Sequence, residues 1–228
     1  MYQAYYRMHP SSEFSEIYSA YAAGCLDPGF ALMVETQAAL RPEIKRALIK
    51  SDIIASIMLE TETESAVSED AFQKTLKMIE AGETNGKTIR PAAHQAIDAI
   101  EEILALPEPL RDTVLETSLS RDWQMLTPGV RRLSLDIHSE AEAELYRIEP
   151  RKTVPRHSHS GPEFTLVVSG GFSDESGQFG PGEMCVKGPD NIHQPTADAD
   201  GVCYAFSLRE GGLKFTGLMG MAQRLLGQ

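Results

Sequence analysis

Cysteine is scarce in this chain of 228 residues, and the cysteines present are not arranged for cross-linking. The three of them, Cys25, Cys185 and Cys203, include no CxxC pair and are odd in number, so they do not make a disulfide framework. The N-terminal residues lack the apolar stretch of a signal peptide, and no later run is long enough to cross a bilayer. We therefore expect a cytoplasmic protein without a membrane segment.

Positive charge is also in short supply, because 21 Lys and Arg residues face 33 Asp and Glu residues, which leaves a net charge of -12. A protein that binds nucleic acid needs a basic surface to displace counterions from phosphates, so direct binding of nucleic acid is not expected. The hydrophobic fraction of 42% and the charged fraction of 24% are those of an ordinary soluble protein. The length suits two modules.

The first part of the chain has the apolar spacing of helices. Asp27 followed by Pro28 is a typical N-cap and first-turn pair, and Pro42 and Ser68 precede two further amphipathic stretches. A helix over 12–23 is predicted by apolar residues at i, i+3, i+4 and i+7, namely Phe14, Ile17, Tyr18 and Tyr21. Residues 1–88 are thus predicted to form a helical bundle.

The pattern changes towards the C-terminus. Residues 83–88 have the composition of a linker, and 89–112 are predicted to be a helical, proline-containing connector. From about Trp123, short β-rich runs alternate with Gly, Pro, Asp and Asn, which favours an antiparallel sandwich or barrel over 113–228. The predicted fold class is therefore α+β, a helical bundle followed by an antiparallel β-barrel.

Three histidines and a glutamate in the β-rich part have the order of a metal site. His157 and His159 are two residues apart, so both rings lie on one face of a strand. Glu163 follows after a short turn, and His193 comes beyond predicted hairpins that can fold it back alongside. The set suits one divalent zinc, iron, manganese, nickel or copper ion, of which we expect zinc. The alternative is a hydrogen-bonded histidine pair without an ion.

The order HxH, Glu, Gly170, a Gly- and Pro-rich turn and then His193 resembles the two signature motifs of the cupin superfamily, whose fold is a double-stranded β-helix. Three positions depart from these motifs, and none of them is a ligand position. Arg151 stands where the first motif usually has glycine. In the second motif Pro189 is displaced by one residue, and Ala197 replaces the usual asparagine.

A closer resemblance, to ChrR-type anti-sigma factors, covers nearly the whole chain. It rests on residues 19–24 (SAYAAG), 30–34 (FALMV), 163–168 (EFTLVV), 171–175 (GFSDE), 179–182 (FGPG) and 193–195 (HQP). The resemblance implies an N-terminal helical domain that holds a sigma factor of the extracytoplasmic-function type, and a C-terminal cupin that carries a metal and takes part in release.

The resemblance also implies a zinc site in the helical domain, but its ligands are missing here. Ser12, Gln37, Arg41 and Ile44 occupy the four positions where the family has a His, a second His and a CxxC pair. None of these residues makes a competent zinc set. We therefore predict a helical domain that is stable without metal.

Two functions are compatible with these patterns. The first is a transcriptional regulator of the ChrR type that binds a sigma factor and senses a signal through its metal-bound cupin. The second is a cupin dioxygenase with open metal coordination positions, in which the helical arm serves as a dimerisation element and the assembly is a homodimer. No substrate-binding set beside the four ligands is recognisable, and a helical arm is unusual for a small dioxygenase, which favours the regulator.

Overall fold

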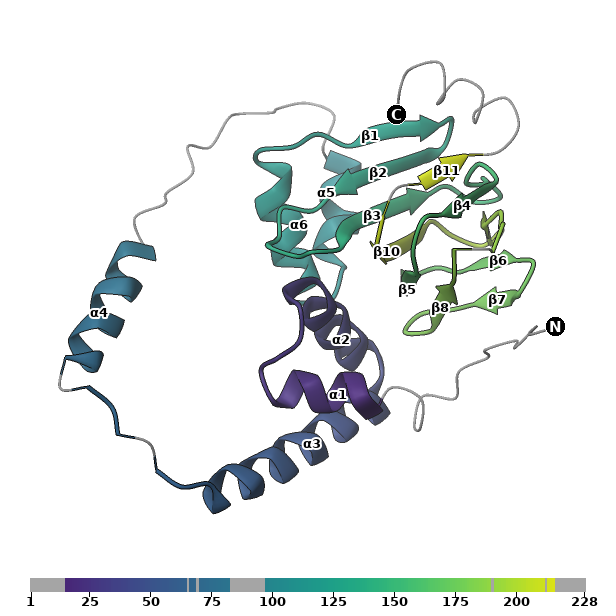
Figure 1. The fold of residues 1–228 in the computed structure, drawn as a ribbon. Helices are drawn as coiled ribbons and strands as arrows, with labels where there is room; N and C mark the ends of the chain where they lie inside the picture. The colour runs from purple at the N-terminus through teal and green to yellow at the C-terminus, as the bar shows by residue number, and fades with distance from the viewer. Residues whose placement is uncertain are drawn as a thin grey trace.

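A computed structural model describes residues 15–82 except 65 and 69, residues 97–211 except 190, and residues 213–215. Helices come first and strands follow, as the fold class predicted (Figure 1). No helix among these residues is both long and apolar enough to span a membrane. The predicted linker over 83–88 lies outside the described residues, and the predicted domain boundaries remain predictions.

The predicted N-terminal helices are present as α1 (Ser15–Ala22), α2 (Pro28–Leu40), α3 (Pro42–Thr61) and α4 (Ala71–Gly82). The Asp27 side chain caps α2 by accepting hydrogen bonds from the backbone N–H groups of Gly29 and Phe30. Tyr18, Val34, Ile44 and Leu48 make a small core between α1, α2 and the first half of α3. This core holds α1 to α3 together.

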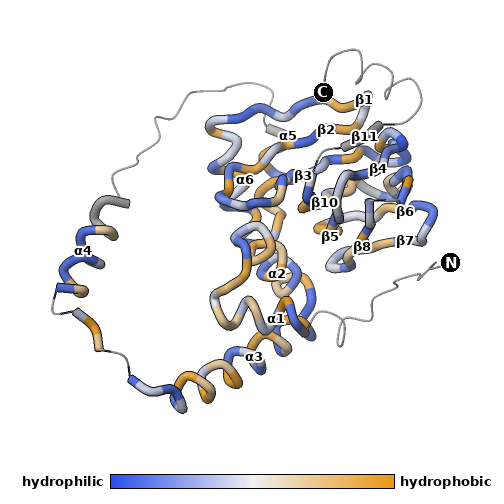
Figure 2. Tube along the Cα trace, viewed as in Figure 1, coloured by the Kyte–Doolittle hydropathy of each residue, from blue (hydrophilic) through white to orange (hydrophobic). Residues whose placement is uncertain are grey.

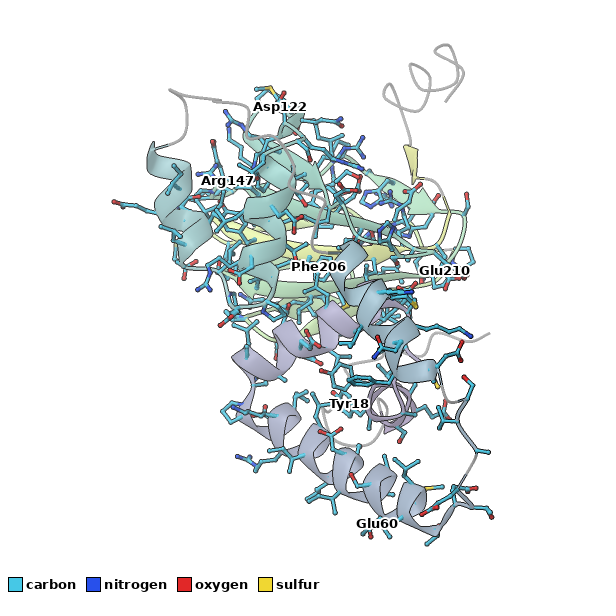
Figure 3. All side chains as sticks on the ribbon, turned by 90° about the vertical axis from the view of Figure 1, so that its left-hand side faces the viewer. Tyr18, Glu60, Asp122, Arg147, Phe206 and Glu210 are labelled. Atoms are coloured by element: carbon cyan, nitrogen blue, oxygen red, sulfur yellow. The ribbon has the colours of Figure 1, made fainter. Side chains whose placement is uncertain are left out.

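The second half of α3 leaves that core and exposes its apolar side chains. Ile57 is 57% exposed and Leu59 is 75% exposed. Figure 2 shows hydrophobic stretches along α3, and Figure 3 places Glu60 at the end of the helix far from the sheet. The chain thus forms a short bundle from which one long helix projects.

Two further helices, α5 (Ile97–Leu104) and α6 (Leu110–Ser118), precede the strands. Helix α6 was not predicted, although Leu110 and Val114 have helical spacing and are fully buried. A short segment between prolines and a β-rich run gives little length for a periodic signal. The part predicted as a connector over 89–112 therefore contains α5 and only the start of α6, and both helices pack on the sheet.

The strands form three antiparallel sheets, ordered β1-β2-β3-β10-β5-β8, β11-β4 and β7-β6-β9. Their bounds are Gln124–Thr127 (β1), Val130–Ser134 (β2), Glu142–Ile148 (β3), His157–His159 (β4), Glu163–Ser169 (β5), Phe172–Asp174 (β6), Gly177–Phe179 (β7), Met184–Lys187 (β8), Thr196–Ala197 (β9), Cys203–Arg209 (β10) and Leu213–Phe215 (β11). This arrangement confirms the antiparallel cupin fold.

The predicted β-barrel is not closed among the described residues. Isolated bridges pair Thr153 with Thr196 of β9, and His157 of β4 with His193, without a continuous ladder there. Pro155, Pro162 and Pro195 lie along these segments and have no N–H group to donate to a ladder, so continuous pairing is interrupted. The β-region is a six-stranded sheet faced by two smaller sheets.

The six-stranded sheet buries both of its faces, because alternate residues point to opposite sides. On one face, Leu145, Leu166 and Phe206 pack with residues of α2, α5 and α6. On the other face, Tyr146, Val167 and Ala205 pack with Phe172 of β6. The sheet is therefore enclosed between a layer of helices and the smaller sheets (Figures 1 and 3).

Polar contacts also fasten the bundle to the sheet. The Gln37 amide Nε2 donates to the backbone oxygen of Gly182 at 3.1 Å, just before β8. The Arg41 guanidinium lies 3.5 Å from the Glu183 carboxylate. The side chain of Phe30 on α2 meets Phe164 on β5 edge to face at a centroid distance of 5.1 Å. Helix α2 is thus the main link between the bundle and the sheet.

Candidate metal centre

The fold brings the four predicted ligands together. His157 and His159 lie on β4, Glu163 begins β5, and His193 is aligned with His157 by two backbone hydrogen bonds of 3.0 and 3.1 Å. One candidate ligand atom from each residue lies within 4.8 Å of all the others. All four side chains are buried, with residue exposures of 1–4%. The short turn at Gly161 and Pro162 lets Glu163 return beside the two histidines.

The orientation of two rings makes the Nε2 atoms of His157 and His193 face each other. The Nδ1 atom of His157 lies 2.7 Å from the Pro155 carbonyl oxygen, which can only accept, so this nitrogen carries the hydrogen. The Nδ1 atom of His193 lies 3.0 Å from the Asp174 carboxylate and carries a hydrogen for the same reason. In neutral rings both Nε2 atoms are then acceptors, yet they are 3.0 Å apart. A cation or a shared proton must lie between them.

His159 and Glu163 complete the cluster. The Nε2 atom of His159 lies 3.1 Å from Oε2 of Glu163, and the buried Nδ1 atom of His159 has no hydrogen-bond partner among the described residues. The other carboxylate oxygen of Glu163, Oε1, accepts a hydrogen bond of 3.0 Å from the Ser207 hydroxyl. Oε2 therefore remains directed at the histidines.

The electrostatics of the cluster favour a cation. Burial raises the pKa of Glu163, but hydrogen bonds from His159 and His193 outweigh this effect and hold the pKa well below 4.5. Burial, together with the neighbouring His193, lowers the pKa of His157 to about 4. Burial acts in the same direction on His193, but its hydrogen bonds to Asp174 and Glu163 prevail and raise its pKa. The buried carboxylates of Glu163 and Asp174 therefore favour the protonated form of His193.

The residues present fit a divalent metal. Three imidazole nitrogens and one carboxylate oxygen are a donor set used for zinc and for several transition metals. A cation would replace the proton between the two Nε2 atoms and compensate the charge of Glu163. A cavity of about 30 Å³ adjoins the cluster and is lined by Val154, Phe172 and Ala205 among others. That volume holds about two water molecules.

The residues that support the ligands were not predicted. Asp174 on β6, Lys187 on β8 and Ser207 on β10 all contact the cluster or its supports. The buried Lys187 lies in a strand of otherwise apolar residues, an unusual pattern that was available as a signal. Of the other histidines, His138 is exposed in a loop, whereas His9 and His94 lie outside the described residues.

Comparisons with known proteins agree with this geometry. Residues 111–210 match the family profile of the ChrR cupin-like domain. This region is therefore similar to the ChrR cupin-like domain. The anti-sigma-E factor ChrR of Cereibacter sphaeroides is 29% identical to the chain over 201 residues, which cover 88% of this chain and 90% of the relative.

A solved structure extends the ChrR similarity to the helical part. In the crystal structure of Rhodobacter sphaeroides SigE in complex with the anti-sigma ChrR, one chain matches with a TM-score of 0.64 and 28% identity. The match covers 86% of this chain and 96% of that chain. The predicted resemblance to ChrR-type anti-sigma factors is confirmed.

The positions that the resemblance assigned to zinc in the helical part have other roles here. Ile44 is 1% exposed in the core of the bundle, and Gln37 is buried at the junction with the sheet. The Tyr18 hydroxyl lies 3.4 Å from Oε1 of Gln37. Ser12 lies outside the described residues. Packing and hydrogen bonds therefore occupy the places of at least two of the implied ligands.

Proposed function

We propose that this chain is an anti-sigma factor that binds a sigma factor of the extracytoplasmic-function type through its N-terminal helices. The observation that carries the proposal is the exposed apolar surface of α3 and α4, in a chain similar to ChrR over both of its parts. The exposed side chains are Ile49, Ile53, Ile54, Ile57, Met58 and Leu59 on α3, and Phe72, Leu76 and Met78 on α4.

An exposed apolar surface of this kind is typical of a site that a binding partner buries. Soluble monomers rarely expose a large contiguous apolar patch unless it binds a partner. Ile53 and Ile57 are 54% and 57% exposed and lie four residues apart, so they are neighbours on one helical face. The net charge of -12 favours a basic partner. A sigma factor bound to these helices would be sequestered from its other binding partners.

The cupin part supplies the sensing role in this proposal. His157, His159, Glu163 and His193 would hold one divalent ion, with zinc as the expected metal. A bound divalent ion would link β4, β5 and the segment before β9 through these side chains. Glu163 is followed by Phe164, which touches Phe30 on α2, so the ligand strand contacts the bundle directly. This contact offers a route from the centre to the sigma-binding helices.

The experiment is to mix the purified full chain with sigma factors from its host and to follow complex formation by size-exclusion chromatography. We expect one of them to bind, and Ile57→Glu combined with Leu59→Glu to weaken binding by at least about tenfold. Met125→Glu is the matched control, because Met125 is 65% exposed but lies on β1. Failure of every sigma factor to associate, or equal binding by the double variant, would contradict the proposal.

The dioxygenase alternative receives no support from the cavity. Apart from the candidate ligands, the residues that line it are mainly apolar and include no charged group that would orient a diketone or a flavonol. Oxygen consumption by the iron-loaded protein with such a substrate, measured with an oxygen electrode, would reverse this preference.

A further inference from the structure

A buried ion pair lies directly behind the candidate metal centre. The Asp174 side chain at the end of β6 has no exposed surface, and the Lys187 side chain at the end of β8 is 7% exposed. Lys187 Nζ lies 2.8 Å from Oδ2 of Asp174, and the same oxygen lies 3.0 Å from Nδ1 of His193. One carboxylate oxygen is thus shared between a lysine and a candidate ligand.

The other oxygen of Asp174 is fixed as well. Oδ1 accepts hydrogen bonds of 2.7 Å from the backbone N–H and 2.6 Å from the hydroxyl of Ser176. Lys187 also donates to the Ser176 hydroxyl. The Cys185 thiol also lies 3.9 Å from Oδ2, so five hydrogen bonds or ion-pair contacts hold one carboxylate in a single orientation.

A contribution to stability does not by itself explain why the Asp174–Lys187 ion pair is buried. Removing a lysine and an aspartate from water costs several kcal/mol per ion, and apolar residues of similar volume often serve equally well or better. Apolar side chains fill the surroundings, since Phe172 and Cys185 beside the pair belong to the buried core. Retention of two charges at this point is explained if they act on a neighbouring group.

We infer that Asp174 and Lys187 are positioning residues of the metal centre, in which Asp174 fixes the ring of His193 with Nε2 towards the other ligands and Lys187 holds Asp174 in place. The inference rests on the proposed metal binding by the four ligands. Among these ligands, His193 is the one whose second nitrogen meets a carboxylate, whereas the second nitrogen of His157 meets a carbonyl oxygen. A carboxylate partner fixes the tautomer and makes the imidazole a stronger donor to a metal.

The test is zinc binding by the metal-free full chain, measured in competition with a chromophoric chelator. Outer partners of this kind typically contribute about 10–100-fold in metal affinity, so Asp174→Asn is expected to weaken zinc binding by that factor. Lys187→Met is expected to weaken it by less, and to have little further effect in the Asp174→Asn background, because Lys187 acts through Asp174. The control is Asp136→Asn, which removes an exposed ion pair with Arg121.

A second readout separates positioning from a general loss of structure. Cobalt(II) bound in place of zinc has visible absorption bands that respond to ligand geometry, and we expect these bands to change in Asp174→Asn and to be unchanged in Asp136→Asn. If Asp174→Asn does not fold, Ser176→Ala carries the test, because it loosens Asp174 without leaving an unpaired buried charge. A several-fold loss of zinc affinity is expected for that variant.

The outcomes are distinguishable. A wild-type chain that binds no zinc overturns the proposed metal site and this inference together. A wild-type chain that binds zinc, with folded Asp174→Asn or Ser176→Ala variants of equal affinity and identical cobalt spectra, overturns the positioning role alone.

Discussion

The histidine cluster and the second half of α3 differ in how their side chains are paired with their surroundings. Around the histidine cluster, buried polar atoms are almost all paired, and the exception there among the described residues is Nδ1 of His159. Along the second half of α3, polar groups face solvent as expected, but large apolar side chains are exposed with them. The first region gathers donors that suit a cation, and the second exposes an apolar surface.

This difference teaches what kind of partner each region accepts. A cluster of nitrogen and carboxylate donors within 4.8 Å of one another is completed by a single ion. A helix that exposes Ile53, Ile57 and Leu59 suits the proposed binding to a protein surface. The junction at Gln37 and Phe30 lies between the two regions, so binding at one can affect the other.

Removing the metal should have the largest effect and should be confined to the cupin side. At a free zinc concentration of 1,000 times its dissociation constant, binding stabilises the folded chain by about 4 kcal/mol. For a chain of this size that corresponds to about 8–16 °C in the unfolding midpoint. We expect calorimetry to show this decrease after chelation in the wild type and no decrease in His159→Ala. An unchanged midpoint in the wild type would contradict it, as would loss of helical circular dichroism before unfolding.

Two isoleucines on α3, one buried and one exposed, allow a buried and an exposed apolar side chain to be compared within one helix. Ile44 is 1% exposed and Ile57 is 57% exposed. Ile44→Ala leaves a cavity in the bundle and should lower the free energy of unfolding by about 3 kcal/mol. Ile57→Ala should change it by less than about 0.5 kcal/mol, because the side chain is already in water. Urea unfolding measures both, and a large loss in Ile57→Ala would mean that the bundle itself covers this residue.

Much of this contrast could be predicted from the sequence. The spacing of His157 and His159 on a strand, followed by Glu163, predicted a shared face that the structure confirms. Asp27 and Pro28 predicted the start of α2 correctly. These features are local, because a strand alternates its side chains and a cap acts within one turn.

The remaining features depend on contacts between distant segments. Asp174 reaches His193 across 19 residues, and Gln37 reaches Gly182 across 145. Nothing in a single sequence marks such pairs, because only the folded sheet brings them together. The open arrangement of the sheets was missed for the same reason, since strand patterns do not specify which edges pair.

Acid should act on the metal-free cupin through His157. Its folded pKa of about 4 lies below the ordinary 6.5, so the unfolded chain binds the proton first, and stability is lost as the pH falls below 6.5. His193 has a raised pKa, so its contribution is complete below pH 6.5 and is lost only as the pH rises. Between about pH 6.5 and 5 the loss should be about 2 kcal/mol, at 1.4 kcal/mol per pKa unit. Urea unfolding at several pH values should show this loss of stability in the wild type. A similar pH dependence in His157→Gln would mean that another group causes the loss.

The smallest expected effect comes from a strained residue in the otherwise well-satisfied β-region. Arg151 has a φ of 61°, in the left-handed region, at the position where the cupin motif usually has glycine. Its backbone N–H lies 3.2 Å from the carbonyl oxygens of both Ala197 and Asp198, and these contacts fix the turn. An L-residue in this conformation costs about 1–2 kcal/mol, and glycine removes that cost. Part of the gain is offset, because glycine also gives the unfolded chain greater conformational freedom. Arg151→Gly should therefore stabilise the chain by about 0.5–1 kcal/mol, seen as a higher midpoint in urea. The neighbouring Lys152→Gly, at a residue without a positive φ, should instead destabilise it, because glycine brings only added freedom there. Equal effects of the two substitutions would show that the turn at Arg151 carries no strain.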